Sequence, residues 1–414
     1  MRLGRLAESG HGSEGVRVRR YGPPPVSSPA FDTEHAGQAR AWGWVAHLRD
    51  GGTTPWAAWR DPAPDDQQAG RYLPGAQQLE LLRRVNAQHL PTPELAERVI
   101  AASAPLRGRP DLGLVGVLPS SSFGPPPVDP AELPPDELVR VATALIAEDV
   151  VAAGPPPEPP RPRRLRRRYR LLGDPGVVVP LRRALVASGR PAGGRGATVV
   201  VAGGDVGRML AHVWTARALG AGVRPWRDWL EVETRRSALL PRIDLAALAA
   251  SWVPRVGAGK VHVVLDDPHL AARLAGARRL TPTATDLSAD AVELARRTAP
   301  VVGTLVTPGL RTTLMWHRLR PVLAAYDGPS LRVPRRHRRW LAEQTGDLRR
   351  RLAAGDYAVH GALTDPVDPV VDRTVDRAGV TAPDEDGVLA LAIRVLLGPP
   401  IGGPSATSMA GEET

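Results

Sequence analysis

The residues with the clearest potential for chemistry are two glycines that follow a short apolar run in the second half of the chain. Gly173 and Gly176 come after residues 169–172 and open a segment with helical character. Backbone N–H groups at such a turn can hold a phosphate, and a Lys and a Ser or Thr hydroxyl normally complete the site. Pro175 has no N–H to donate, and Val177–Val179 stand where those side chains are needed. The sequence therefore favours an ordinary strand-to-helix turn over a phosphate site here.

Arginines near this turn offer a second route to anion binding. Arg182 and Arg183 lie on the segment after the two glycines, and Arg208 opens the helix expected after the next apolar run. The fork of an arginine can clamp a phosphate where no lysine is present. These three arginines, with Gly173 and Gly176, are the candidate cofactor-binding residues.

The only lysine of the chain, Lys260, stands in a sequence that superficially resembles a Walker loop. The residue five positions before Gly259 is Pro254 instead of glycine, and Val261 stands where Ser or Thr is required. The segment also precedes an expected strand instead of opening a helix. We interpret it as a turn.

Two histidines have carboxylates within reach in the sequence. His212 lies seven residues after Asp205, which is a natural helix N-cap, and His269 lies just beyond Asp266 at the end of the third apolar run. Such pairs could exchange protons or form a weak metal site. A packing role beside Trp214 is the favoured alternative for His212, and a turn followed by a helix start is the alternative at residues 266–269. No metalloprotease or serine-hydrolase motif is present, and we expect no metal.

The composition excludes several classes of protein. The 414 residues include 54 basic and 43 acidic side chains, which gives a net charge of +11, and there is no cysteine. Disulfide scaffolds, thiolate metal sites and cysteine nucleophiles are therefore excluded. No apolar run is long enough for a transmembrane helix, and none follows the first cations as in a secretory signal. We expect a cytoplasmic protein.

The positive charge is concentrated in two segments. Residues 161–170 contain seven arginines and residues 335–339 contain four, which together equal the whole excess. The Arg161–Arg170 cluster could contact nucleic acid or an anionic membrane surface. It lies next to a proline-rich stretch and has one aromatic residue, so a solvated tether is the favoured interpretation and nucleic acid is not the expected partner.

The chain divides into five parts by composition and periodicity. We expect a disordered leader at 1–35, a helical domain at 36–153, a Pro/Arg-rich linker at 154–168, an α/β domain at 169–398 and a flexible tail at 399–414. In the fourth part, short runs rich in β-branched residues alternate with helical segments. This alternation predicts a three-layer α/β fold with a mostly parallel sheet, preceded by a small all-α domain.

Several segments of the α/β part resemble the sulfotransferase-like proteins of actinobacteria, which have a P-loop fold. Residues 198–214 are similar to that family's valine-rich strand and its following helix with a tryptophan, and residues 226–230 to its Trp-x-x-Trp-Leu segment. Residues 243–264 resemble its helix that ends in Trp before a Val-His-Val-Val strand. Residues 352–361 resemble its Gly-x-Tyr-x-Val-x-Gly segment. The shared order of these segments carries the resemblance.

The resemblance implies a sulfotransferase-like fold and a site for adenosine 3′-phosphate 5′-phosphosulfate (PAPS), but the functional positions depart from the family pattern. The family's Pro-Lys-Thr-Gly-Thr-Thr loop falls on residues 174–179, which lack the lysine and hydroxyls. Of the residues that grip the 3′-phosphate, only Arg208 remains. We therefore expect a degenerate active site without a bound cofactor.

Three functional hypotheses follow. The first is a non-catalytic binding or accessory protein whose partner is another protein or a small anionic ligand. The second is an active sulfuryl- or other group-transferase that uses PAPS through Arg182, Arg183 and Arg208. The third is a nucleic-acid or anionic-surface adaptor that works through the Arg161–Arg170 cluster.

Overall fold

The structure is a computed structural model of the 414-residue chain. It describes residues 29–61 (29–35 by their backbone alone), 73–102, 110–117, 125–158, 168–190, 192–193, 196–220, 222–277, 286–363 and 379–402.

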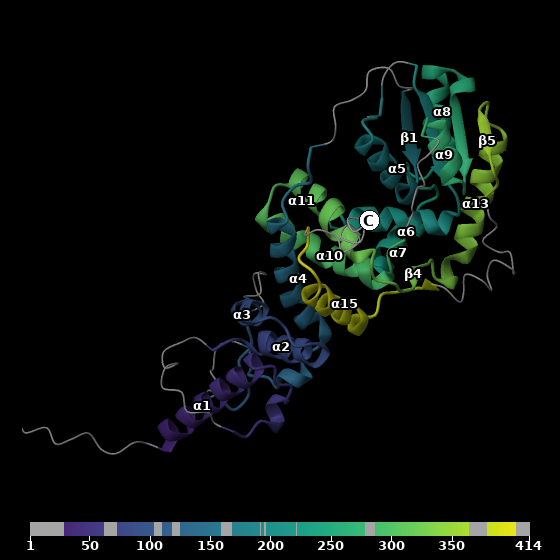
Figure 1. Ribbon diagram of the computed structural model, residues 1–414. Helices are drawn as coiled ribbons and strands as arrows, with labels where there is room; N and C mark the ends of the chain where they lie inside the picture. The colour runs from purple at the N-terminus through teal and green to yellow at the C-terminus, as the bar shows by residue number, and fades with distance from the viewer. Residues whose placement is uncertain are drawn as a thin grey trace, which may run out of the picture.

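A four-stranded parallel sheet forms the centre of the second half (Figure 1). Its strands lie in the order β1 (Tyr169–Gly173), β2 (Thr198–Gly203), β3 (Val261–Leu265) and β5 (Ala358–His360). The two central strands are almost entirely apolar because both of their faces are covered. Neighbouring strands follow one another in chain order. Among the described strands there is therefore no reversal of order of the kind at which doubly wound sheets bind nucleotides.

Helices cover both faces of the sheet, because successive side chains of a strand point to opposite sides. Helices α5 (Pro175–Ala187) and α9 (Pro268–Leu274) pack on the face that carries Leu171, Val200 and Val264. Helix α8 (Leu245–Val256) packs on the opposite face, and α13 (Arg338–Ala353) packs against α8. The expected α/β class and its three layers are confirmed.

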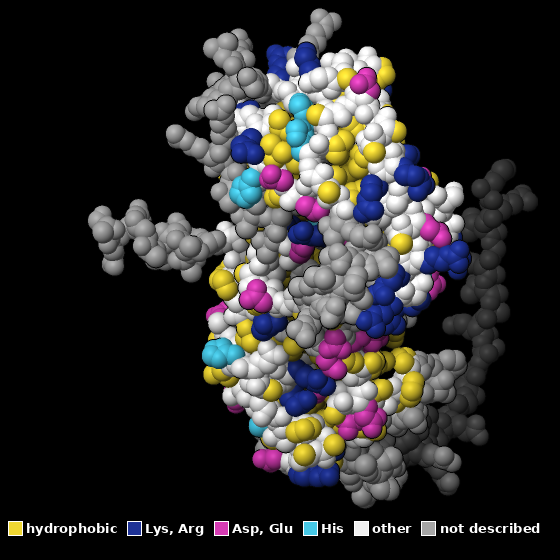
Figure 2. All heavy atoms as spheres, turned by 90° about the vertical axis from the view of Figure 1, so that its right-hand side faces the viewer, with side chains coloured by type: hydrophobic (Ala, Val, Ile, Leu, Met, Phe, Trp, Pro, Cys, Tyr) yellow, Lys and Arg dark blue, Asp and Glu magenta, His cyan; other side chains and the backbone are white. Residues whose placement is uncertain are grey.

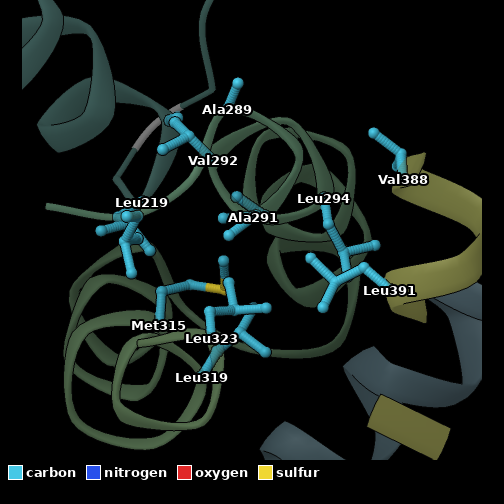
Figure 3. Packing of buried hydrophobic residues seen from close by; sticks show 14 of the residues in the cluster. Leu219, Ala289, Ala291, Val292, Leu294, Met315, Leu319, Leu323, Val388 and Leu391 are labelled. Atoms are coloured by element: carbon cyan, nitrogen blue, oxygen red, sulfur yellow. The ribbon is translucent and has the colours of Figure 1, made fainter. Parts of the chain in front are cut away.

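A helical layer extends beyond the carboxyl edge of the sheet. It consists of α6 (Val206–Ala218), α7 (Trp226–Thr234), α10 (Ala289–Leu305), α11 (Pro308–Leu314), a π-helical turn η5 (Met315–Leu319), α12 (Arg320–Leu323) and α15 (Glu385–Leu397). Figure 3 shows Val292, Leu319 and Leu391 from three of these elements converging in one buried cluster. A short parallel pair, β4 (Ser330–Leu331) and β6 (Gly379–Val380), lies outside the main sheet.

The first half is helical, as expected. Its elements are α1 (Pro29–Arg49), η1 (Trp56–Ala58), α2 (Ala76–Gln88), α3 (Pro93–Ala101), η3 (Pro130–Glu132) and α4 (Pro135–Ala152). Helix α4 packs against α10 and α15, and the buried side chains of both halves form one cluster (Figure 1). Packing therefore crosses the expected boundary at 154–168 instead of separating two cores there.

Several expected boundaries differ from the structure. Helix α1 begins at Pro29, so part of the expected leader 1–35 is helical. The structure describes residues 154–158 of the linker and 399–402 of the tail, and most of the Arg161–Arg170 cluster lies outside the described residues. Strand β5 was not predicted, because it has three residues and lies at the sheet edge, where Val359 is exposed. A strand this short has no periodicity to detect.

Two sets of helices repeat one arrangement of tryptophans. The first helical unit consists of α1, η1, α2 and α3, and the second helical unit of α6, α7, α10 and α11. Trp56, preceded by Pro55, comes 12 residues after Trp44. Trp226, preceded by Pro225, likewise comes 12 residues after Trp214. The indole Nε1 of Trp44 donates to the Thr54 carbonyl at 2.9 Å, and that of Trp214 to the Arg224 carbonyl at 3.0 Å. The ring centroids of the two tryptophan pairs lie 5.4 Å and 5.7 Å apart.

A buried carboxylate clamp is repeated in the same order along the chain. Glu80 on α2 accepts hydrogen bonds from the arginines three and four residues later, and so does Glu293 on α10. Both carboxylates are nearly inaccessible to solvent. The first arginine of each clamp also reaches the tryptophan turn of its own unit, where Arg83 donates to the Thr53 carbonyl and Arg296 to the Val223 carbonyl. The two helical units thus share local sequence and tertiary contacts.

Candidate functional site

Three successive strands each deliver an aspartate to the carboxyl edge of the sheet. Asp174 follows β1, Asp205 follows β2 after a Gly-Gly turn, and Asp266 follows β3. The strands continue to pair up to this point, since Asp174 N–H donates to the Ala202 carbonyl and Asp266 N–H to the Gly203 carbonyl. Parallel strands end at one edge, so residues remote in the sequence meet there.

Two of these aspartates cap the helices that follow them. Asp174 accepts the Gly176 N–H at 2.9 Å at the start of α5, and Asp205 accepts the Arg208 N–H at 2.6 Å at the start of α6. A carboxylate at a helix N-terminus is stabilised by the free N–H groups and by the helix dipole. The capping role predicted for Asp205 is confirmed.

His212 joins two carboxylates from different parts of the chain. Its Nδ1 lies 2.8 Å from both oxygens of Asp174, and its Nε2 lies 2.9 Å from Oδ1 of Asp286. The Nε of Arg208 donates to the other oxygen of Asp286 at 3.0 Å. His212 and Asp174 are buried, whereas the side chains of Asp286 and Arg208 are 31% and 50% exposed. The result is a chain of alternating charge that runs from the end of β1 to the surface.

The surroundings of His212 favour its charged form. Burial opposes the charge, but the hydrogen bonds and negative charges of Asp174 and Asp286 outweigh it and raise the pKa of His212 to about 9. Burial acts against the charge on Asp286 too, but His212 and Arg208 lower the pKa of that carboxyl to about 2. At neutral pH the imidazole of His212 is therefore positively charged and lies between the side chains of Asp174 and Asp286.

The other two aspartates of this edge, Asp205 and Asp266, have pKa values above the usual value for aspartate. Burial raises the pKa of both Asp205 and Asp266, and the charge of Asp205 raises that of Asp266 further. Asp266 has a positive φ of 54°, a conformation that Asp adopts more readily than most residues. A side chain at Gly204 would collide with the Asp266 carboxylate, which explains the glycine there.

The two glycines predicted for phosphate binding serve the protein's own groups. Gly173 has a φ of 103°, and a Cβ at this position would collide with the carbonyl of Ala202 on the neighbouring strand. A Cβ at Gly176 would collide with the imidazole of His212. The first glycine therefore permits close strand packing, and the second makes room for the histidine.

The structure does not bring the three candidate arginines together on one group. Arg182 donates to the Leu171 carbonyl at 2.8 Å, Arg183 to the Trp316 carbonyl at 2.6 Å, and Arg208 to Asp286.

The second histidine prediction is not supported by contacts. His269 is exposed on α9, and no hydrogen bond joins it to Asp266 among the described residues. The adjacent Asp267 accepts the Leu270 N–H at 2.7 Å, so the helix-start alternative is confirmed at this turn.

Sequence reasoning missed the partners of His212. Asp174 was considered only as part of a degenerate loop, although its position directly after a strand was a usable signal. Asp286 lies 74 residues from His212, and nothing in the sequence connects them. The packing role predicted for His212 was incomplete, because both ring nitrogens bind carboxylates.

The second arginine segment, residues 335–339, pairs with acidic side chains of two different helices. In the second arginine segment, Arg336 pairs with Glu231 and Arg339 with Glu343. Figure 2 shows basic and acidic side chains interspersed over the face that carries β5 and α13. Within the described ranges, no three His, Asp or Glu side chains are arranged to hold a metal, and no helix is long and apolar enough to cross a membrane.

Comparison of the chain with family models, with curated proteins and with solved structures found no match.

Proposed function

We propose that this chain is a sulfotransferase-like α/β protein that has lost PAPS binding and acts as a non-catalytic binding or accessory protein. The resemblance of residues 198–214 and 243–264 to that family motivates the fold assignment. One observation carries the functional part, namely that protein side chains occupy the start of α5.

A phosphate at the start of α5 would compete with Asp174 for the same backbone donor. The Gly176 N–H already binds Oδ1 of Asp174 at 2.9 Å, and the His212 imidazole fills the space beside Gly176. The positive charge of His212 is already paired with Asp174 and Asp286, so it is not available to a phosphate unless one of these pairs breaks. The helix start is thus satisfied internally, and a phosphate would have to displace Asp174 from the Gly176 N–H.

The one arginine left from the family pattern is also engaged. The Nε of Arg208 donates a hydrogen bond to Asp286. Burial opposes the charge of this guanidinium, but the neighbouring aspartates outweigh it and raise the pKa of Arg208. If Arg208 turned to a bound ligand, Asp286 would keep only its hydrogen bond with His212 among the described residues. This supports an accessory role over sulfate transfer.

Isothermal titration calorimetry of the full chain with PAPS tests the proposal. We expect no binding in the micromolar range. Micromolar binding that disappears in Arg208→Ala and persists in Arg227→Ala, an exposed arginine on α7, would overturn it.

A second candidate is an active transferase, favoured by the Asp174–His212–Asp286 chain at the carboxyl edge of the sheet. Enzymes of the α/β class place catalytic groups at this edge, and strongly shifted pKa values are typical of active sites. Transfer of radiolabelled sulfate from PAPS to a cell-envelope acceptor, lost in Arg183→Ala, would establish this alternative. Absence of transfer under the same conditions supports the accessory role.

A further inference from the structure

A cavity of about 310 Å³ lies in the first helical unit, where α1, α2 and α3 contact one another. Its volume falls at the lower end of the range for small-molecule sites in proteins. Trp42 on α1 and Ile100 on α3 give it apolar walls, and both side chains also pack against the core. Glu97 and Ala101 on its α3 side are exposed, so the cavity opens to solvent there.

The buried amide of Gln78 brings an acceptor without a donor to the cavity wall. Gln78 is 2% exposed, and its Nε2 donates to the Ala102 carbonyl at 2.5 Å. This bond fixes the orientation of the amide, because the opposite orientation would place two oxygens against each other. Oε1 has no hydrogen-bond partner among the described residues. It lies at the wall beside Gly75, where a Cβ would come within 2.6 Å of it. An unpaired buried acceptor is costly, so a donor from a bound molecule would be favourable.

The charged side chains of the cavity are already engaged. The Nε of Arg49 lies 2.8 Å from Oε1 of Glu97, and Asp111 has an interaction of its own. A charged ligand would have to compete with these contacts, whereas an uncharged N–H donor needs only Oε1 of Gln78. The lining therefore favours an uncharged ligand with an N–H group and an apolar part.

The second helical unit fills the corresponding place with apolar side chains. The tryptophan turn, the Glu-Arg-Arg clamp and the Thr-Pro start of α3 and α11 align the two units. In this alignment the positions of Arg49, Gln78 and Ile100 correspond to Leu219, Ala291 and Met315. All three of the latter are fully buried in one apolar cluster, which Figure 3 shows. The packing of such a unit thus requires neither the glutamine nor the cavity.

We propose that this cavity binds a small uncharged molecule that carries an N–H group, as in an amide or a nitrogen heterocycle, on an aromatic ring. Gln78 Oε1 would accept from the N–H group, and the ring would pack against Trp42 and Ile100. This site lies in the first helical unit, remote in the sequence from the start of α5, and it goes beyond the accessory role proposed above.

NMR titration of the full chain with benzamide and with acetophenone tests the site. The two probes have nearly the same shape, but acetophenone carries a methyl group in place of the amide NH₂. We expect millimolar binding of benzamide, about fivefold tighter than that of acetophenone, as a single hydrogen bond between uncharged groups would give. Gln78→Met should remove this preference, and Gln88→Met, at an exposed position at the end of the same helix, should retain it.

A second variant blocks the cavity and leaves Gln78 in place. Ala101→Trp introduces the residue type that stands at the corresponding position of the second unit, Trp316. It should fill the opening and weaken both probes about tenfold or more, and thermal unfolding shows whether each variant is folded. Absence of benzamide binding at millimolar concentration, equal binding of the two probes, or a preference that survives in Gln78→Met would overturn the site. None of these results bears on PAPS binding, which the calorimetry with Arg208→Ala tests separately.

Discussion

The first and second helical units keep the same packing but differ where the second unit meets the sheet. His212 lies two residues before Trp214, and the corresponding position before Trp44 is Trp42. Asp286 lies seven residues before Glu293, and the corresponding position before Glu80 is Leu73. Trp42 and Leu73 are half-buried and pack against the core. The polar pair of one unit thus corresponds to two apolar residues in the other.

This difference separates the packing that the two units share from the polar cluster that only the second unit carries among the described residues. The tryptophan turn and the Glu-Arg-Arg clamp occur in both units, so they belong to the packing of the unit itself. The charged chain through His212 occurs once, together with the sheet. A buried ion pair is often no more stabilising than apolar side chains of similar volume, so stability alone does not explain its presence.

The largest effects should come from the buried clamps, and they should be alike in the two units. Glu80→Gln takes the carboxylate from Arg83 and Arg84, and Glu293→Gln takes it from Arg296 while Arg297 keeps Glu385. Each change should lower the free energy of unfolding by about 3 kcal/mol, because it disrupts a buried ion pair. Urea denaturation measures both. The exposed helical pair provides the control, since Glu343→Gln should change stability by less than about 0.5 kcal/mol. A large loss in one clamp and none in the other would break the equivalence of the units.

Of the two helical units, the second should add a pH dependence through His212 and Asp286. The raised pKa of His212, about 9 against 6.5, means that its contribution is complete below pH 6.5 and is lost as the pH rises through about 9. The lowered pKa of Asp286, about 2, means that its contribution is present above about pH 4 and is lost as the pH falls toward 2. Deprotonation of His212 should lower the free energy of unfolding by about 3 kcal/mol.

Urea denaturation between pH 6 and pH 9.5 tests the contribution of His212. His212→Gln should remove most of the decline in stability at high pH, whereas the same change at the exposed His269 should leave it intact. An unchanged decline in His212→Gln would show that the imidazolium is not its source.

A smaller and again matched effect is expected at the tryptophans. Trp44→Phe and Trp214→Phe each remove a bond to a backbone carbonyl and leave unfilled space in the core, at a cost of about 2 kcal/mol. Trp252→Phe, at a half-exposed position, should cost less than about 1 kcal/mol. Thermal unfolding of the three variants compares them directly, and unequal losses at Trp44 and Trp214 would count against a shared packing role.

The smallest effect should come from Asp286→Asn. Its side chain is 31% exposed, so the stability loss should be about 1 kcal/mol, but one of the two negative charges on His212 disappears. The pKa of His212 should therefore fall below 9, which an NMR titration would detect, with His212→Gln identifying the signal. An unaltered titration would mean that Asp174 alone sets the charge of the imidazole.

Elements with a long or strongly periodic pattern were predictable from the sequence. The apolar runs expected as strands at 197–202 and 260–265 form the two central strands, Thr198–Gly203 and Val261–Leu265. The helix expected after the first run, at 205–219, forms α6, Val206–Ala218. Asp205 was predicted correctly as an N-cap because capping involves residues a few positions apart. Strand β5 was missed because it is short and half exposed.

The sequence by itself determined these local elements, the absence of cysteine and the absence of a lysine, serine or threonine among residues 174–179. Only the tertiary structure decided which groups meet at the start of α5. Asp174 and His212 are 38 residues apart, and Arg183 and Trp316 are 133 apart. Local propensity carries no information about pairs this remote, because they meet only when the parallel strands align their ends and the helical layer packs against α5. The candidate site is therefore a property of the folded chain.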